Sequence, residues 1–274
     1  MFPALTLLLN RDESSTSGKA PRLLLAIDSD RAVPVLLSPE YFTIGNAKVY
    51  YIIRALNEAG KRIPHETLFP FIDEARPLIA KYPYDCMYAA ALIAYAHNPN
   101  DSAELTFRAE LKSSNKKRVQ EAAAEALAIL SGVAEARDLV YQAEEILGFD
   151  GLSPPLKDYY AVSMYDAEVN NGGHAQYFVN SSGDRWKEAI EGLNAIGANG
   201  RAKILHEATA LFGADRPSTD EKRRHRQLAD FSGQQDKSLD ELDRRCGTSE
   251  ENIEMMLAQY AIENADHFRH KRDE

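Results

Sequence analysis

Apolar residues recur at helical spacing along nearly the whole chain, and this limits the fold more than any other feature of the sequence. Four aliphatic residues between positions 49 and 56 share one side of a predicted helix over 47–59, and Gly60 follows as a stop. A predicted helix near the end of the chain repeats the pattern over 253–261. Since no run alternates apolar and polar residues in the manner of a strand, the sequence predicts an all-α fold.

The first half has the spacing of a helical repeat. Predicted helices begin near residues 47, 84 and 116, about 37 and 32 residues apart, a period typical of stacked helix pairs. We therefore predict a HEAT-like repeat region over residues 1–148, with an irregular helical bundle as the alternative. Such arrays usually present a concave surface to a protein partner. The Gly- and Pro-containing stretch 150–155 predicts a domain boundary in this part of the chain, with a second helical domain over residues 149–274.

Capping signals predict where helices begin in the second half. Asp184 is expected to cap the helix that follows it. Ser238–Glu241 and Thr248–Glu251 both match the Ser/Thr-x-x-Glu capping box, so helices are predicted to begin at about residues 239 and 249.

The chain is mildly acidic throughout, which argues against direct binding of nucleic acid. Its 274 residues include 32 Lys and Arg against 42 Asp and Glu, divided into 16 against 20 up to residue 150 and 16 against 22 after it. Such a chain repels a phosphate backbone on average. Acidic residues dilute the short basic runs Lys222–Arg226 and Arg269–Arg272, and we interpret both as solvated helix faces.

Cysteine use and hydropathy favour a cytoplasmic protein with no membrane partner. Cys86 and Cys246 lie far apart and form no Cys-x-x-Cys motif, so reduced thiols are expected. The apolar opening, Phe2–Leu9, lacks a basic start and a small-residue cleavage pattern, and predicts a short packed helix rather than a signal peptide. No apolar run approaches the ~18 residues of a membrane span.

A polar, glycine-rich stretch from Glu168 to Trp186 is the candidate functional site, and we call it the polar corner. Gly172 is expected to end one helix in the left-handed conformation, and Asn171 or Gly173 to start a short second helix. A second turn follows at residues 181–183. The polar residues therefore lie at two successive helix ends, where they could simply satisfy backbone groups.

The short helix between these turns is predicted to have an inner and an outer face. Phe178 and Val179 are expected to pack inward, whereas Gln176, Tyr177 and Asn180 cluster on another face and present polar groups to a neighbouring backbone or a partner. The candidate interaction residues of the polar corner are Glu168, Asn170, Asn171, Gly172, Gly173, His174, Gln176, Tyr177, Asn180 and Asp184.

Catalysis at the polar corner is the alternative to binding. Glu168, His174 and Asp184 could supply an acid, a base and an orienting group. The stretch offers no committed nucleophile, because Ser181 and Ser182 follow no strand. Its histidine spacing matches no metal motif. We therefore expect no metal, no cofactor and no enzymatic activity, and keep an enzyme of unknown class as an alternative.

The same residues carry a resemblance to a known family. The stretch Glu168–Trp186 and the later segment Ala195–Gly213 resemble a bacterial helical domain of unknown function that is shared with the C-terminal part of a DNA-mimic protein. The resemblance covers about residues 150–265 and is absent from the N-terminal half. It implies an all-α, non-enzymatic protein, with a homodimer as one arrangement. The DNA-mimic relative displays acidic side chains in place of DNA phosphates and so occupies a DNA-binding protein.

A phosphate mimic needs acidic side chains along one surface. The candidates in the second half are Asp236, Asp240, Glu241, Asp243, Glu250, Glu251 and Glu254. These acids could also serve the first turns of helices, where negative charge is favourable. We predict a protein-interaction module that binds and inhibits a partner protein. The alternatives are a DNA mimic that occupies a nucleic-acid-binding protein and an immunity protein that neutralises a toxin.

Overall fold

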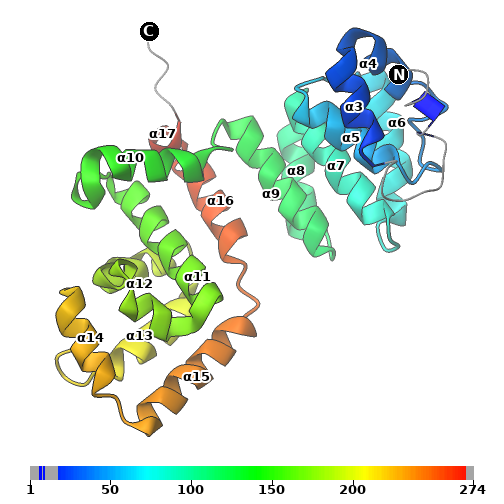
Figure 1. Cartoon of the computed structure of the whole chain (residues 1–274). Coiled ribbons are helices and arrows are strands. Elements are labelled where there is room, and N and C mark those ends of the chain that lie inside the picture. Colours follow the sequence, from blue (N-terminus) through cyan, green and yellow to red (C-terminus); the bar gives the residue numbers. More distant parts are fainter. Residues whose placement is uncertain (1–5, 8, 10–17, 270–274) are drawn as a thin grey trace. The chain divides into compact units, whose positions relative to one another are not determined.

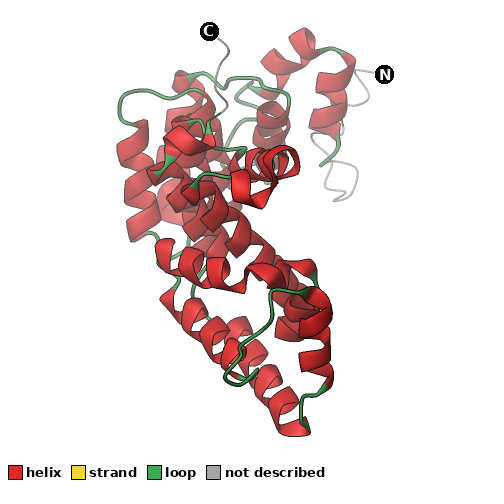
Figure 2. Cartoon of the chain, turned by 90° about the vertical axis from the view of Figure 1, so that its left-hand side faces the viewer, coloured by secondary structure: helices red, strands yellow, loops and turns green. Residues whose placement is uncertain are grey.

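The protein is helical throughout its described part, as the periodicity of the sequence predicts. The structure, a computed structural model, describes residues 6–7, 9 and 18–269. These residues form helices joined by turns and loops, with no strand among them (Figure 2). The predicted helix over Phe2–Leu9 lies mostly outside the described residues. No helix in the described part combines the length and apolar character needed to cross a membrane.

The chain divides into two compact units, Met1–Ala134 and Glu135–Glu274. The helices of the first unit are α3 (Ala20–Ile27), α4 (Ser29–Leu36), α5 (Val49–Glu58), α6 (His65–Ala75), η1 (Arg76–Leu78), α7 (Tyr84–His97), α8 (Ala103–Ser113) and α9 (Lys117–Ser131) (Figure 1). Three of them, α5, α7 and α9, begin within two residues of the predicted starts.

Helix α7 is the core of the first unit. It packs against α5, α6, α8 and α9, and nearly all of its residues from Cys86 to Ala96 are buried. A helix that is apolar on every side is stable only when neighbours cover it on every side. The sequence did not predict α3 and α4, which pack on each other and, through α3, on α5. The HEAT-like repeat stays a prediction.

The second unit is built around one long helix. Its helices are α10 (Ala136–Gly151), α11 (Pro154–Val179), η2 (Ser181–Arg185), α12 (Trp186–Ala195), α13 (Asn199–Ala210), α14 (Glu221–Ala229), α15 (Gly233–Gly247), α16 (Ile253–Glu263) and α17 (Ala265–Phe268). Helix α11 contacts α10, α12, α14, α15, α16 and α17 (Figure 1). The unit begins before α10, whereas the predicted domain boundary coincides with a break inside α10, at Gly148.

Two predicted helix starts are wrong. Helix α15 is capped earlier, by Ser232 and Gln235, whose side chains each bond the other's backbone N–H. Ser238 therefore lies inside the helix, where the buried face of Leu239, Leu242 and Cys246 continues past it. Helix α16 begins after Asn252, whose side chain accepts the N–H of Met255 at 3.1 Å. The Ser/Thr-x-x-Glu pattern is only four residues long, so it also occurs at positions that do not begin a helix. In α15 and α16 the helix starts at another residue, which has its own side-chain cap.

Candidate functional site

Helix α11 breaks inside the polar corner, because a carboxylate from α15 approaches its backbone. Gly173 has a φ of +75°, and a Cβ at this position would collide with the Asp243 carboxylate. Asp243 Oδ1 accepts the backbone N–H of His174 at 2.8 Å, a donor that the break would otherwise leave without a helical partner. The prediction that Gly172 adopts the left-handed conformation is therefore wrong, because the residue with a positive φ is Gly173.

His174 is fully buried between α11 and α15, with 0% of its surface exposed. Its Nδ1 lies 2.5 Å from Asp243 Oδ1, and its Nε2 lies 3.1 Å from the Tyr165 hydroxyl, which also contacts Cys246 Sγ at 3.6 Å. Burial disfavours the imidazolium form and is the largest single effect, but the interactions with Asp243 and Cys246 together outweigh it and raise the pKa of His174. Burial likewise opposes ionisation of Asp243, yet its bonds to His174 lower its pKa. The pair joins the two helices.

Glu168 organises the other polar side chains of the corner. Its Oε2 accepts from Gln176 Nε2 at 2.6 Å and from Asn180 Nδ2 at 2.9 Å, and its Oε1 accepts from Ser182 Oγ at 3.4 Å. The two amides do lie on one side of the helix, as the spacing predicts. They are directed to a carboxylate of the same unit, so these hydrogen bonds tie the short helix and the turn after it to the part of α11 that precedes the break.

The inner face of the short helix differs from the prediction. Tyr177 and Phe178 are fully buried, while Val179 is 43% exposed. After the break at Gly173 the helix buries positions 174, 177 and 178, which form one stripe at helical spacing. Burial raises the pKa of Tyr177, and its hydroxyl has no hydrogen-bond partner among the described residues.

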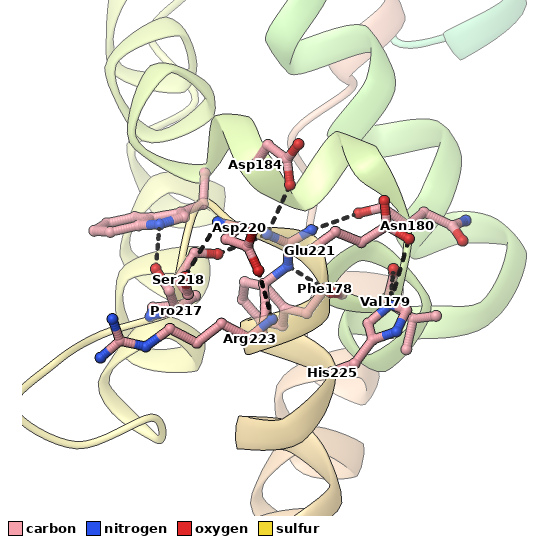
Figure 3. Close-up of polar contacts among 12 residues, drawn as sticks. Phe178, Val179, Asn180, Asp184, Pro217, Ser218, Asp220, Glu221, Arg223 and His225 are labelled. Atoms are coloured by element: carbon pink, nitrogen blue, oxygen red, sulfur yellow. Dashed lines mark hydrogen bonds and ion pairs between the residues drawn. The ribbon is translucent and has the colours of Figure 1, made fainter.

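Asp184 pairs with a buried arginine that the sequence analysis missed. The Arg224 guanidinium is 0% exposed, and its Nη1 lies 2.7 Å from Asp184 Oδ1. It also donates to three backbone carbonyls, those of Phe178 at 2.6 Å, Asn180 at 2.9 Å and Ser218 at 2.6 Å (Figure 3). The prediction that Asp184 caps α12 is wrong, because α12 has no side-chain cap and the carboxylate binds Arg224.

The basic run 222–226 is therefore not a uniformly solvated face. Asp220 caps α14 by accepting the N–H of Arg223 at 2.8 Å, and this start turns Arg224 inward. The guanidinium passes so close to Gly183 that a Cβ there would lie 2.9 Å from Arg224 Nε. A usable signal was present, since the apolar Leu228, which is half-buried, follows Arg224 by four residues and shares its side of the helix.

A second buried arginine joins α13 to α11 and α15. Arg201 is 4% exposed and donates from Nη1 to the Cys246 carbonyl at 2.9 Å and from Nη2 to Asp166 Oδ1 at 2.5 Å. Asn170 supports the same carboxylate, donating from Nδ2 to Asp166 Oδ2 at 2.9 Å. Asn171, the remaining asparagine at the break, is exposed.

The candidate acids fall into two groups. Three have partners inside the unit. Asp243 binds His174, Glu241 pairs with Arg244 at 2.5 Å, and Glu251 accepts the N–H groups of Gly200 and Arg201, each at 2.8 Å. The other four acids, Asp236, Asp240, Glu250 and Glu254, are exposed and form no ion pair in the described part of the chain. This second group lies along α15, in the loop after it and at the start of α16, where a partner could reach it.

Neither the cavity of the first unit nor a metal site offers a second candidate functional site. In the first unit, α5, α7 and α9 line a cavity of about 460 Å³. Its lining contains both positive and negative side chains, including Arg54 and Arg118 as well as Glu121 and Glu125. The lining therefore favours neither anionic nor cationic ligands. Among the described residues, no group of three or more His, Cys, Asp or Glu side chains is placed to hold a metal ion.

Comparison with known proteins finds a family resemblance within the second unit. Residues 150–264 match the family of DMP19-like proteins, which confirms the resemblance predicted from Glu168–Trp186. The matched range contains the break at Gly173, the buried Arg224 and the acidic helix α15. No curated protein and no solved structure matches the chain.

Proposed function

We propose that the chain is a non-enzymatic protein-binding module whose DMP19-like region occupies the DNA-binding surface of a partner protein. The observation that carries the proposal is the exposed acidic group on α15 and at the start of α16, which lies inside the range that matches the family. Its members are Asp236, Asp240, Glu250 and Glu254.

The spacing of charge along α15 suits this role. Asp236 and Asp240 are four residues apart and therefore share a face, about 6 Å apart along the helix axis. Two phosphate steps on one DNA strand span a similar length, about 7 Å. The cations farther along α15 are neutralised, since Arg244 pairs with Glu241 and Arg245 pairs with Glu207. Lys237 is the exposed cation of α15 that is closest in sequence to the two aspartates, about 100° around the helix from Asp236 and about 60° from Asp240.

The polar corner supports binding rather than catalysis. Glu168, His174 and Asp184 each engage a different partner, namely the corner amides, Asp243 and Arg224. A catalytic acid and base need to converge on one reacting atom. In this unit the three side chains stabilise the framework that carries α15.

Competition binding tests the proposal. A DNA-binding protein captured from the native host by the full chain should be displaced by duplex DNA. The double variant Asp236→Asn/Asp240→Asn should bind that partner at least about tenfold more weakly, a loss of ~1.4 kcal/mol. Glu191→Gln, which removes an exposed acid from α12, is the matched control and should bind normally. Binding that resists duplex DNA and tolerates the double variant would refute the proposal.

A further inference from the structure

The second unit also contains a basic pocket, beside the loop that joins α13 to α14. It has a volume of about 380 Å³, within the range of ~300–1,000 Å³ typical of small-molecule sites. The lining residues that matter here are Trp186, Lys187, Asp215, Arg216, Ser218 and Arg223. Three cations thus face one carboxylate, in a half of the chain that is acidic overall.

None of the three cations forms an ion pair with a described carboxylate. Arg216 donates from Nη1 to Thr209 Oγ1 at 3.1 Å and to the His206 carbonyl at 3.3 Å. Its Nε and Nη2 groups therefore remain available to donate to a ligand. The Arg223 side chain has no hydrogen-bond partner in the described part of the chain. Figure 3 shows it extending past Pro217, on the side away from His225. Lys187 Nζ lies over the Trp186 ring, 5.4 Å from its centroid.

The loop that carries Arg216 is held in place by its neighbours. Gln227 bridges it, donating to the Arg216 carbonyl at 2.9 Å and accepting the Ser218 N–H at 2.8 Å. The Trp186 indole donates to the Pro217 carbonyl at 2.9 Å. Arg216 itself has a φ of +56°, in the left-handed region that non-glycine residues rarely adopt. Backbone strain of this kind persists only where surrounding contacts enforce it. The cations therefore lie on a preorganised scaffold.

We propose that this pocket binds a phosphate dianion. Three cations and Asp215 give the lining a charge of two positive, which matches the −1.5 to −2 of a phosphate monoester near pH 7. Arg216 and Arg223 present forked donors to the phosphate oxygens, and Lys187 adds a point charge.

Isothermal titration calorimetry on the full chain tests the site, with inorganic phosphate and AMP as ligands and adenosine as the ligand without phosphate. Phosphate or AMP should bind, and adenosine should not. Arg223→Gln and Lys187→Gln should each weaken binding about tenfold, the factor equivalent to ~1.4 kcal/mol. Arg226→Gln, an exposed arginine of α14 outside the pocket lining, should bind like the wild type. Tighter binding of AMP than of phosphate would identify an organic monoester, and the reverse would identify the free ion.

Three outcomes would overturn the proposal. The first is the absence of binding by both phosphate and AMP at millimolar concentration. The second is wild-type affinity in both Arg223→Gln and Lys187→Gln, with circular dichroism showing that the variants are folded. The third is an equal loss in Arg226→Gln, which would indicate diffuse attraction by the basic helix.

Discussion

Replacing Arg224 with methionine should destabilise the second unit more than any change on its surface. Methionine fills much of the same space but removes every donor of the guanidinium. It leaves Asp184 without its cation and removes donors from the carbonyls of Phe178, Asn180 and Ser218. Removing one partner of a buried ion pair costs about 3–5 kcal/mol. Since the Asp184 side chain is 33% exposed and can be partly rehydrated, we expect the lower end, about 3 kcal/mol.

This loss is large relative to the stability of a domain, which is typically about 5–15 kcal/mol. For a unit of this size the melting temperature should fall by roughly 10 °C. Arg224→Lys should give an intermediate loss, because an ammonium keeps the charge but cannot reach all of the acceptors that the planar fork reaches. Arg226→Met, on the exposed side of the same helix, is the matched control and should change stability by less than about 0.5 kcal/mol.

Trp186 makes the measurement specific to the second unit. It is the only tryptophan in the sequence, and its indole donates to Pro217 in the loop that Arg224 holds. Urea unfolding of the full chain, followed by tryptophan fluorescence, should show an earlier midpoint in Arg224→Met with a similar slope. Circular dichroism reports both units and should retain the transition of the first. A midpoint for Arg224→Met equal to that of Arg226→Met would refute the role assigned to the buried arginine.

The contacts of Asp243 with His174 and with Gly173 give two further predictions. Stability from the raised pKa of His174 is fully present below the unfolded value of about 6.5 and is lost as pH rises through the folded pKa. Stability from the lowered pKa of Asp243 is present above about pH 3.9 and is lost as pH falls through its folded pKa. The difference in urea midpoint between wild type and His174→Gln should therefore be largest near pH 5 and shrink above the raised pKa; a constant difference would contradict the pairing. Gly173→Ala should cost more than Gly213→Ala, since both glycines have positive φ but only Gly173 faces a carboxylate. The strain alone is about 1–2 kcal/mol, and equal melting temperatures for the two variants would show that the contact with Asp243 is unimportant.

The helices could be predicted where their signals are local. Helix α7 has an apolar sequence throughout, and α5 ends two residues before Gly60, because periodicity and a glycine stop act within a few residues. The capping box predicted at Ser238 failed because its signal is equally local. A four-residue pattern does not show whether a longer apolar stripe already continues through it, as the stripe of α15 does.

The polar corner shows a different limit of sequence reasoning. Its residues and its two turns could be identified, and Gln176 and Asn180 were placed on one side correctly. Their partner, Glu168, belongs to the same stretch, yet a break between them removes any fixed spacing. The backbone angles of Gly172 and Gly173 set which side of the short helix faces the core. The sequence does not give these angles, and for this reason it predicts Val179 inside and Tyr177 outside, the reverse of the structure.

The sequence by itself determined the all-α fold and the similarity of residues 150–264 to DMP19-like proteins, since the first depends on local periodicity and the second on a contiguous motif. Only the tertiary structure decided what the polar residues do. Asp243 meets His174 across 69 residues, and Arg224 meets the carbonyl of Phe178 across 46. A buried charge must find its partners wherever the fold brings them. No pattern within a single helix can therefore distinguish an arginine that is buried from one that remains on the surface.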